Sequence, residues 1–309
     1  MKMSYLLFAS FVLVALVLSG CDDSANDGVV RSNPFRGGTE SVSIIFETDN
    51  PPRETFADIP FSVILKVRNT GEYTIPQNEF KVKIQGFNPD TYGLSVAQTE
   101  RTANMDLLGT VFDVDRNVIQ GTEDYIEFGP LGYRETLNTL LQVPIQAIAC
   151  YSYGTNVVSN ICIKTDVSRD MPGDVCVVNE NKPVYTSSGP IQVTSLKQSP
   201  RGSNTIAINF QVEHKGVGEF FNPSVAASCE LPERNRVFIT VDGPAGIDCP
   251  ALGGGSSGMV TLSETTGRLI SCTLDVSSAS SNYVQPININ IEYNYKQTIM
   301  RSVEIKPVN

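Results

Sequence analysis

A short acidic stretch is the first candidate for chemistry in this chain of 309 residues. Asp113, Asp115 and Asn117 alternate, and Asp124 follows seven residues later. Calcium binds clustered oxygen ligands, and alternate residues place such ligands on one side of a strand or loop. However, Val118 stands where a calcium loop needs glycine, and Asp124 stands where it needs a bidentate glutamate. The stretch is therefore a weak calcium candidate, and the alternative is a polar strand end and turn.

Other polar motifs point away from catalysis. His214 is the single histidine, and it could act as a general base only with a positioned nucleophile and an orienting carboxylate. Because it lies near Gly216, where the similar strand at Phe61 has Asn69, it is interpreted as a turn residue. The stretch 253–258 is rich in glycine but lacks the lysine and helix of a phosphate loop, so it is interpreted as a flexible loop. We therefore predict no enzyme, no catalytic residue and no cofactor. A hydrolase or metalloenzyme is the least favoured alternative.

The cysteines form a second pattern. Seven are present, and setting Cys21 aside leaves six, an even number that indicates disulfides in an exported chain. Two expected pairs, Cys162 with Cys176 and Cys249 with Cys272, each flank a turn-rich segment. By elimination the remaining pair would be Cys150 with Cys229.

Short strands must position these residues. Apolar and polar residues alternate with a period of two, many of the apolar ones are β-branched, and Gly, Pro and Asn separate the runs, which is typical of half-buried strands. The clearest run is Phe61 to Asn69, followed by Thr70 and Gly71. Leu140 to Thr165 is predicted as a hairpin turning at 154–156, and Ile287 to Ile305 as a hairpin turning at 294–296. The sequence therefore predicts an all-β fold.

The order of the strands repeats. Ile191 to Thr194 matches Val42 to Ile45, and Ile206 to Gly216 matches Phe61 to Gly71. Arg236 to Val241 matches the strand at Lys81. We interpret this order as an internal duplication. It predicts two tandem immunoglobulin-like β-sandwich domains, at residues 41–185 and 189–307.

The N-terminus is typical of an export signal. Lys2 precedes an apolar run from Tyr5 to Leu18, and small residues follow it. The sequence Leu18-Ser19-Gly20-Cys21 resembles the lipobox of prokaryotic lipoproteins. That resemblance implies a signal peptide at residues 1–20 and lipid attachment at Cys21. The alternatives are a membrane helix that is not cleaved and ordinary secretion.

Residues 21–40 lack apolar periodicity and are rich in Asp, Ser, Asn and Gly, which predicts a flexible tether between the lipid and the folded part. The formal net charge is −10. Because nucleic acids are bound through many cationic contacts, an acidic chain without a Lys/Arg cluster argues against a nucleic-acid partner.

One further resemblance concerns the folded part. The stretch Phe61 to Gly71, with Val-Ile-Leu-Lys-Val-Arg-Asn-Thr-Gly at its centre, is similar to CARDB-type immunoglobulin-like domains of archaeal and bacterial surface proteins. Together with the stretches at 36–40, 149–153 and 161–163, it resembles uncharacterised archaeal lipoproteins. The resemblance implies a surface-anchored, non-catalytic architecture and supplies no functional residues.

These observations predict a lipid-anchored cell-surface protein with a role in adhesion, in binding an unknown protein or glycan, or in envelope structure. The membrane contact would be made by the lipid. A subunit of an extracellular filament or pilus is the alternative. Tyrosines suit partner surfaces because they combine a large ring with a polar tip, although they also fill sandwich edges and corners. The candidates of this kind are Tyr151, Tyr153, Tyr283, Tyr293 and Tyr295.

Overall fold

The computed structural model describes residues 30, 32–226, 228–230 and 232–308. Its regular elements are strands and four short 3-10 helices, so the predicted all-β class is confirmed. The predicted signal peptide and Cys21 lie outside the described residues. The 3-10 helices are η1 (Gln77–Glu79), η2 (Asp90–Tyr92), η3 (Val96–Thr99) and η4 (Pro250–Leu252).

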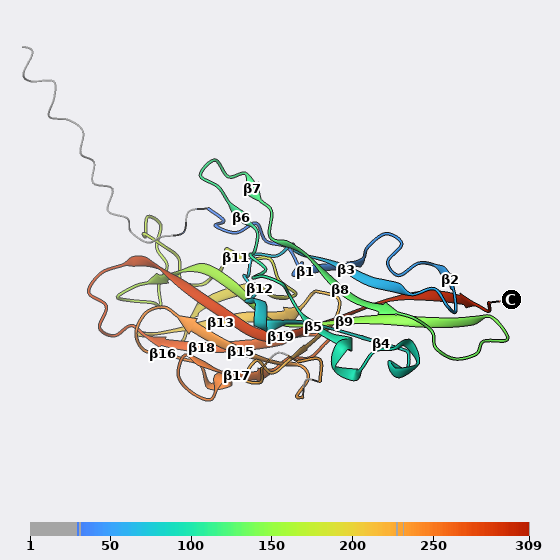
Figure 1. Ribbon diagram of the computed structural model, residues 1–309. Coiled ribbons are helices and arrows are strands. Elements are labelled where there is room, and N and C mark those ends of the chain that lie inside the picture. The colour runs from blue at the N-terminus through green and yellow to red at the C-terminus, as the bar shows by residue number, and fades with distance from the viewer. Residues whose placement is uncertain (1–29, 31, 227, 231, 309) are drawn as a thin grey trace, which may run out of the picture.

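A nine-stranded sheet runs the whole length of the molecule (Figure 1). Two long strands, β9 (Leu141–Ile163) and β19 (Tyr283–Lys306), pair antiparallel along their full length at its centre. The shorter strands flank them: β4 (Phe80–Gln85), β5 (Glu100–Thr102) and β11 (Val184–Thr186) on the side of β9, and β2 (Glu54–Phe56), β14 (Glu219–Phe221), β15 (Arg236–Asp242) and β17 (Ser257–Thr261) on the side of β19.

Two smaller sheets complete the fold. The first holds β1 (Val42–Phe46), β3 (Phe61–Asn69) and β8 (Glu123–Leu131). The second holds β10 (Glu180–Lys182), β12 (Ile191–Pro200), β13 (Thr205–His214), β18 (Arg268–Asp275) and β16 (Ile247–Asp248). A separate hairpin joins β6 (Val111–Phe112) and β7 (Val118–Ile119).

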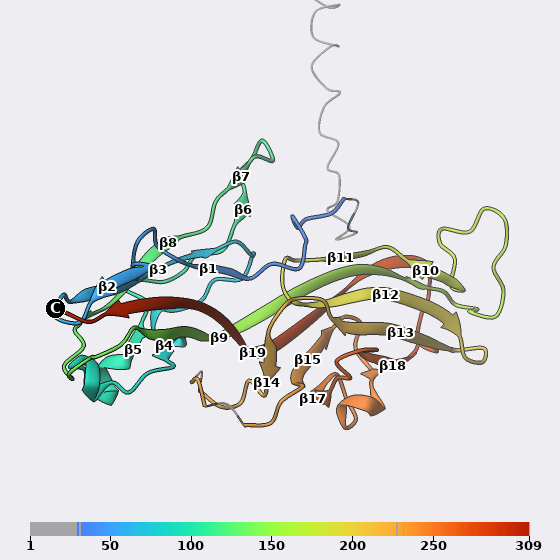
Figure 2. The same ribbon diagram turned by 90° about the vertical axis from the view of Figure 1, so that its right-hand side faces the viewer.

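The alternating burial of β3 and β13 shows why these sequences form such layers, because every second residue faces the core. Each small sheet covers one half of the long sheet (Figure 2), and this makes two β-sandwich lobes. We call the lobe of β1, β3 and β8 lobe 1, and the lobe of β12, β13 and β18 lobe 2.

Both predicted hairpins within the long strands are wrong, because β9 and β19 continue straight through the expected turns. The turn-forming residues have other roles there. Gly154 leaves room for the ring of Tyr73, which would lie 2.5 Å from an added Cβ. The buried side-chain amide of Asn294 donates to the carbonyl oxygens of Asn222 and Val225, both at 2.8 Å. Packing therefore outweighs the local turn signals.

The structure bears out the internal duplication. Val42 pairs with Asn69 at the start of β1, and Ile191 pairs with His214 at the start of β12. The following turns also match. The N–H groups of residues 70 and 71 donate to the carbonyl of Ser41, and those of residues 215 and 216 donate to the carbonyl of Pro190.

The strands beside β9 and β19 indicate an approximate twofold relation between the halves, because β4 pairs with residues 146–151 of β9 as β15 pairs with residues 288–292 of β19. Tyr151 pairs with Tyr295, and Tyr153 pairs with Tyr293. The axis passes near the pair of Ser152 and Asn294, whose side chains are joined by a 3.0 Å hydrogen bond. Tyr151 and Tyr153 therefore correspond to residues 293 and 295 in the second half.

The predicted boundary, from residue 185 to residue 189, begins within β11 and ends before β12. The strands do not divide at that boundary, because β19 belongs to the second half of the sequence but pairs with β9 and β2 of the first half. The boundary thus marks the repeat in the sequence, while the long sheet is common to both lobes (Figure 2).

Two corresponding glycines give a testable consequence of this packing. An added Cβ at Gly71 would lie 1.8 Å from the hydroxyl of Tyr153, and one at Gly216 would lie 2.8 Å from the hydroxyl of Tyr295. Because a packed core resists insertion, we expect Gly71→Ala and Gly216→Ala each to lower the free energy of unfolding by about 1–3 kcal/mol. Chemical denaturation measures this.

Gly132→Ala is the matched control, since the nearest atom to its added Cβ is 3.7 Å away. It is expected to change the free energy of unfolding by less than about 0.5 kcal/mol. Equal effects at Gly71 and Gly132 would contradict the close contact with Tyr153.

Candidate functional site

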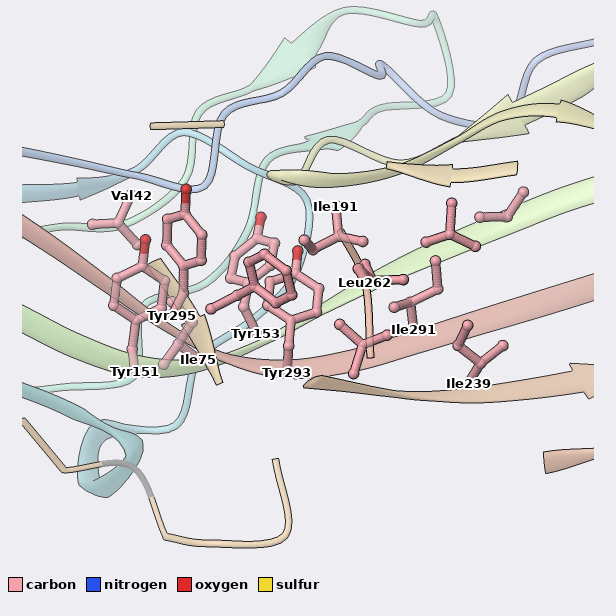
Figure 3. Packing of buried hydrophobic residues seen from close by; sticks show 14 of the residues in the cluster. Val42, Ile75, Tyr151, Tyr153, Ile191, Ile239, Leu262, Ile291, Tyr293 and Tyr295 are labelled. Carbon is pink, nitrogen blue, oxygen red and sulfur yellow. The ribbon is translucent and has the colours of Figure 1, made fainter. Parts of the chain in front are cut away.

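Four tyrosines meet at the junction of the lobes, on the face of the long sheet that the small sheets cover (Figure 3). Tyr151, Tyr153, Tyr293 and Tyr295 are each at most 1% exposed. The ring centroids of Tyr151 and Tyr295 are 5.9 Å apart, and those of Tyr153 and Tyr293 are 6.0 Å apart. Burial raises the pKa of all four hydroxyls, so they remain neutral donors.

Each hydroxyl of this cluster has a partner. The hydroxyl of Tyr151 lies 2.7 Å from Ser41 Oγ, and that of Tyr293 lies 2.9 Å from Thr155 Oγ1. The hydroxyl of Tyr153 donates to the carbonyl of Ser188. The cluster therefore joins the small sheets and their turns to the long sheet, and it is structural.

The four are therefore excluded as partner-facing candidates, and the favoured interpretation, that such tyrosines fill the sandwich, is confirmed for them. The remaining one, Tyr283 at the start of β19, is 41% exposed. Sequence periodicity missed the burial because the predicted hairpin placed Tyr295 in a turn.

His214 belongs to the same packing. Its Nε2 lies 3.1 Å from the hydroxyl of Tyr295, and its ring lies beside Phe220. Burial lowers the pKa of His214, and the charge of Glu264 opposes this shift. At the end of β13 it occupies the place that Asn69 has at the end of β3, as the duplication predicts.

The residues of the calcium candidate do not form one ligand cluster in the structure. Asp113 accepts hydrogen bonds from the N–H groups of Asp115 and Asn117 in the turn between β6 and β7. Asp124 is buried in β8, where its carboxylate accepts from the backbone and side chain of Asn104 at 2.7 and 3.0 Å. Within the described residues no three His, Cys, Asp or Glu side chains are grouped as metal ligands. The proposed ligand set is therefore corrected to a turn and a separate strand contact.

Three disulfides are formed, and they are the pairs expected from the sequence. Cys162–Cys176 and Cys249–Cys272 close short segments of the chain, and Cys150–Cys229 ties β9 to the loop after β14. Disulfides of this number are typical of proteins that mature in an oxidising compartment.

The loop closed by Cys162–Cys176 also holds an ion-pair group that sequence reasoning missed. Lys164 is 3% exposed, and its Nζ lies 2.6 Å from Asp174 and 3.2 Å from Asp170. Burial opposes the charge of Lys164, but the hydrogen bonds that its ammonium group donates to the two carboxylates raise its pKa overall. The group fixes the conformation of this loop.

A groove in the described surface lies beside β19. This groove has a volume of about 700 Å³ and runs between the edge of β1 and the edge of β19. Val42 and Ile44 line it from β1, and Gln297 and Ile299 line it from β19. The groove could not be found from the sequence, because the continuous strand β19 was predicted as a hairpin.

The comparisons with known proteins give little beyond this. No family model and no curated protein matches the chain. One aligned solved structure is "Enterococcal surface protein, partial N-terminal region", with 8% sequence identity and a TM-score of 0.17; the alignment covers 86% of this chain and 87% of that chain. Another is "collagen adhesin (CNA) from S. aureus", with 8% identity and a TM-score of 0.10; the alignment covers 91% of this chain and 97% of that chain. A third is the Escherichia coli alpha-2-macroglobulin activated by porcine elastase, with 7% identity and a TM-score of 0.13; the alignment covers 86% of this chain and 32% of that chain. At these TM-scores the alignments carry no argument about fold or function.

Two further observations concern membrane-spanning helices and the predicted tether. Among the described residues, no helix is long and apolar enough to span a bilayer. The residues just before β1 are attached to the folded part, since the N–H groups of Arg36 and Gly37 donate to the carboxylate of Glu72 at 2.8 and 3.0 Å. This end of the predicted tether therefore lies against the lobes.

Proposed function

We propose that this chain is a lipid-anchored cell-surface protein whose two β-sandwich lobes bind a partner or build envelope structure without catalysis. The observation that carries this proposal is the set of three disulfides, because such bonds are typical of proteins outside the reducing cytoplasm. The lipobox-like sequence ending in Cys21 supports attachment of the exported lobes to the outer face of the membrane. The partner, a protein or a glycan, would be met by the exposed surface of the lobes.

The lipid anchor is tested by metabolic labelling with a lipid precursor. The wild-type chain is expected to carry the label, and Cys21→Ser is expected to carry none, because the thiol that accepts the lipid is gone. Protease accessibility on intact cells serves as the control that the wild type is exported. Equal labelling of both chains would contradict an anchor at Cys21.

A filament subunit is the second candidate function. One observation favours it: part of the edge of β19 is not paired with any described strand, although it lies beside a groove that can hold an extended chain. Strand addition at a free sheet edge is a recurring mode of protein association.

A further inference from the structure

The internal duplication allows the outer edges of the two long strands, β9 and β19, to be compared. In lobe 2, β11 pairs antiparallel with the edge of β9 at Val157 to Ser159. The N–H of Ser187, directly after β11, donates to the carbonyl of Asn156 at 2.8 Å. The twofold relation carries residues 157–159 of β9 onto residues 299–301 of β19, since Tyr151 and Tyr153 correspond to residues 293 and 295.

That equivalent edge of β19 is open among the described residues. Beyond Lys296, which pairs with β14, the next residue paired on this side is Glu304, which pairs with β2. The N–H of Glu304 donates to the carbonyl of Arg53 on this side. Because backbone groups alternate along a strand, the N–H and C=O groups of Thr298 and Met300 face the open side too. These are the groups that bind an added strand.

The space beside this edge suits one extended chain. The groove borders β19 from residue 296 to residue 299, and it is lined by Val42, Ile44 and Ile148, whose side chains are almost fully buried. Val217, 83% exposed, borders it as well. A strand in this position would therefore gain backbone hydrogen bonds to β19 and an apolar contact with Val217.

The segment that corresponds to β11 can be identified from spacing. Four residues, 187–190, separate β11 from β12, and the same spacing before β1 points to residues 35–37. In the structure this segment turns away at Gly37 and Gly38, whose φ angles are 75° and 108°. Such angles suit glycine and interrupt an extended strand. The arm, defined as residues 32–38, consequently lies away from the open edge of β19.

Polar contacts hold the arm at the surface. Glu72 accepts from the N–H groups of residues 36 and 37, and the carbonyl of Gly38 accepts from the N–H of Gly189 and the side-chain amide of Gln192. No residue of the described arm is buried. Residues 33, 35 and 37 are half-buried, but no residue of the arm belongs to the hydrophobic core, so that core stays closed when the arm leaves this position.

We propose that the open edge of β19 binds the arm of a second copy of this chain, antiparallel to β19, in the position that β11 occupies on β9. The arm of one copy and the edge of the next are different surfaces, so the contact is heterologous and extends head to tail. The proposal deepens the filament candidate and names the partner. It does not depend on the lipid at Cys21, whose loss would leave this contact intact.

Cross-linking between separately tagged copies of the full chain tests the proposal. Arg36 takes the position of Tyr185, which pairs with Val158, so it would lie opposite Met300. We expect Arg36→Cys in one copy and Met300→Cys in the other to form a mixed disulfide on oxidation. The yield should exceed at least tenfold that of a control pair with Leu269→Cys, which is 58% exposed on β18. A yield equal to the control would overturn the proposal.

Two further measurements distinguish binding of the arm of another copy from binding of the arm of the same chain. A chain carrying both cysteines is expected to form cross-linked oligomers, and closure within monomers at every concentration would overturn the proposal. Met300→Pro should abolish oligomers in sedimentation because it removes an N–H at the open edge. Met300→Lys keeps that N–H and should still form oligomers. Equal sedimentation of the two variants would contradict binding at the open edge of β19.

Discussion

Replacing Tyr293 with alanine is expected to lower the free energy of unfolding by about 3–5 kcal/mol, as for other large buried aromatic residues. Tyr151→Ala should have an effect of similar size, because the two tyrosines are equivalent under the twofold relation. Each is fully buried, and each contributes a ring to the junction and a hydroxyl bound to Thr155 or Ser41. Guanidinium denaturation followed by circular dichroism measures both losses.

Tyr283→Ala is the matched control on the same strand as Tyr293. Its side chain is 41% exposed, so the expected change is within about 0.5 kcal/mol. A loss at Tyr283 as large as that at Tyr293 would show that the tyrosine cluster is not the centre of the fold.

The second large effect concerns the halves of the chain. Residues 41–185 alone contain β9 but lack β19, and residues 189–307 alone contain β19 but lack β9. Each half would expose an unpaired long strand and the tyrosines that its partner covers. We therefore expect both fragments to remain unfolded when produced separately, with circular dichroism spectra that lack the β signal of the full chain.

The alternating strands and the cysteines could be predicted from sequence because both depend on local pattern or simple position. The run from Phe61 to Asn69 became β3 with every second residue buried, and the repeat of its final turn located the corresponding strand β13. The three disulfides join the cysteines that flank the expected segments. These features follow from the period of a strand and from the even number of cysteines.

The long strands could not be predicted, because residues that usually mark turns are used there for packing. Gly154 admits the ring of Tyr73, and Asn294 satisfies backbone carbonyls from a loop distant in sequence. Once β9 and β19 are continuous, the tyrosines at 293 and 295 point into the core and the edge after Lys296 becomes open. The candidate groove is therefore a product of tertiary contacts that no single stretch encodes.

The two lobes are expected to form one cooperative unit around β9 and β19, and calorimetry of the full chain measures this cooperativity. With the disulfides intact, the full chain is expected to unfold in one transition whose calorimetric enthalpy equals its van't Hoff enthalpy. Two separate transitions, each matching the unfolding of one isolated half, would contradict this expectation.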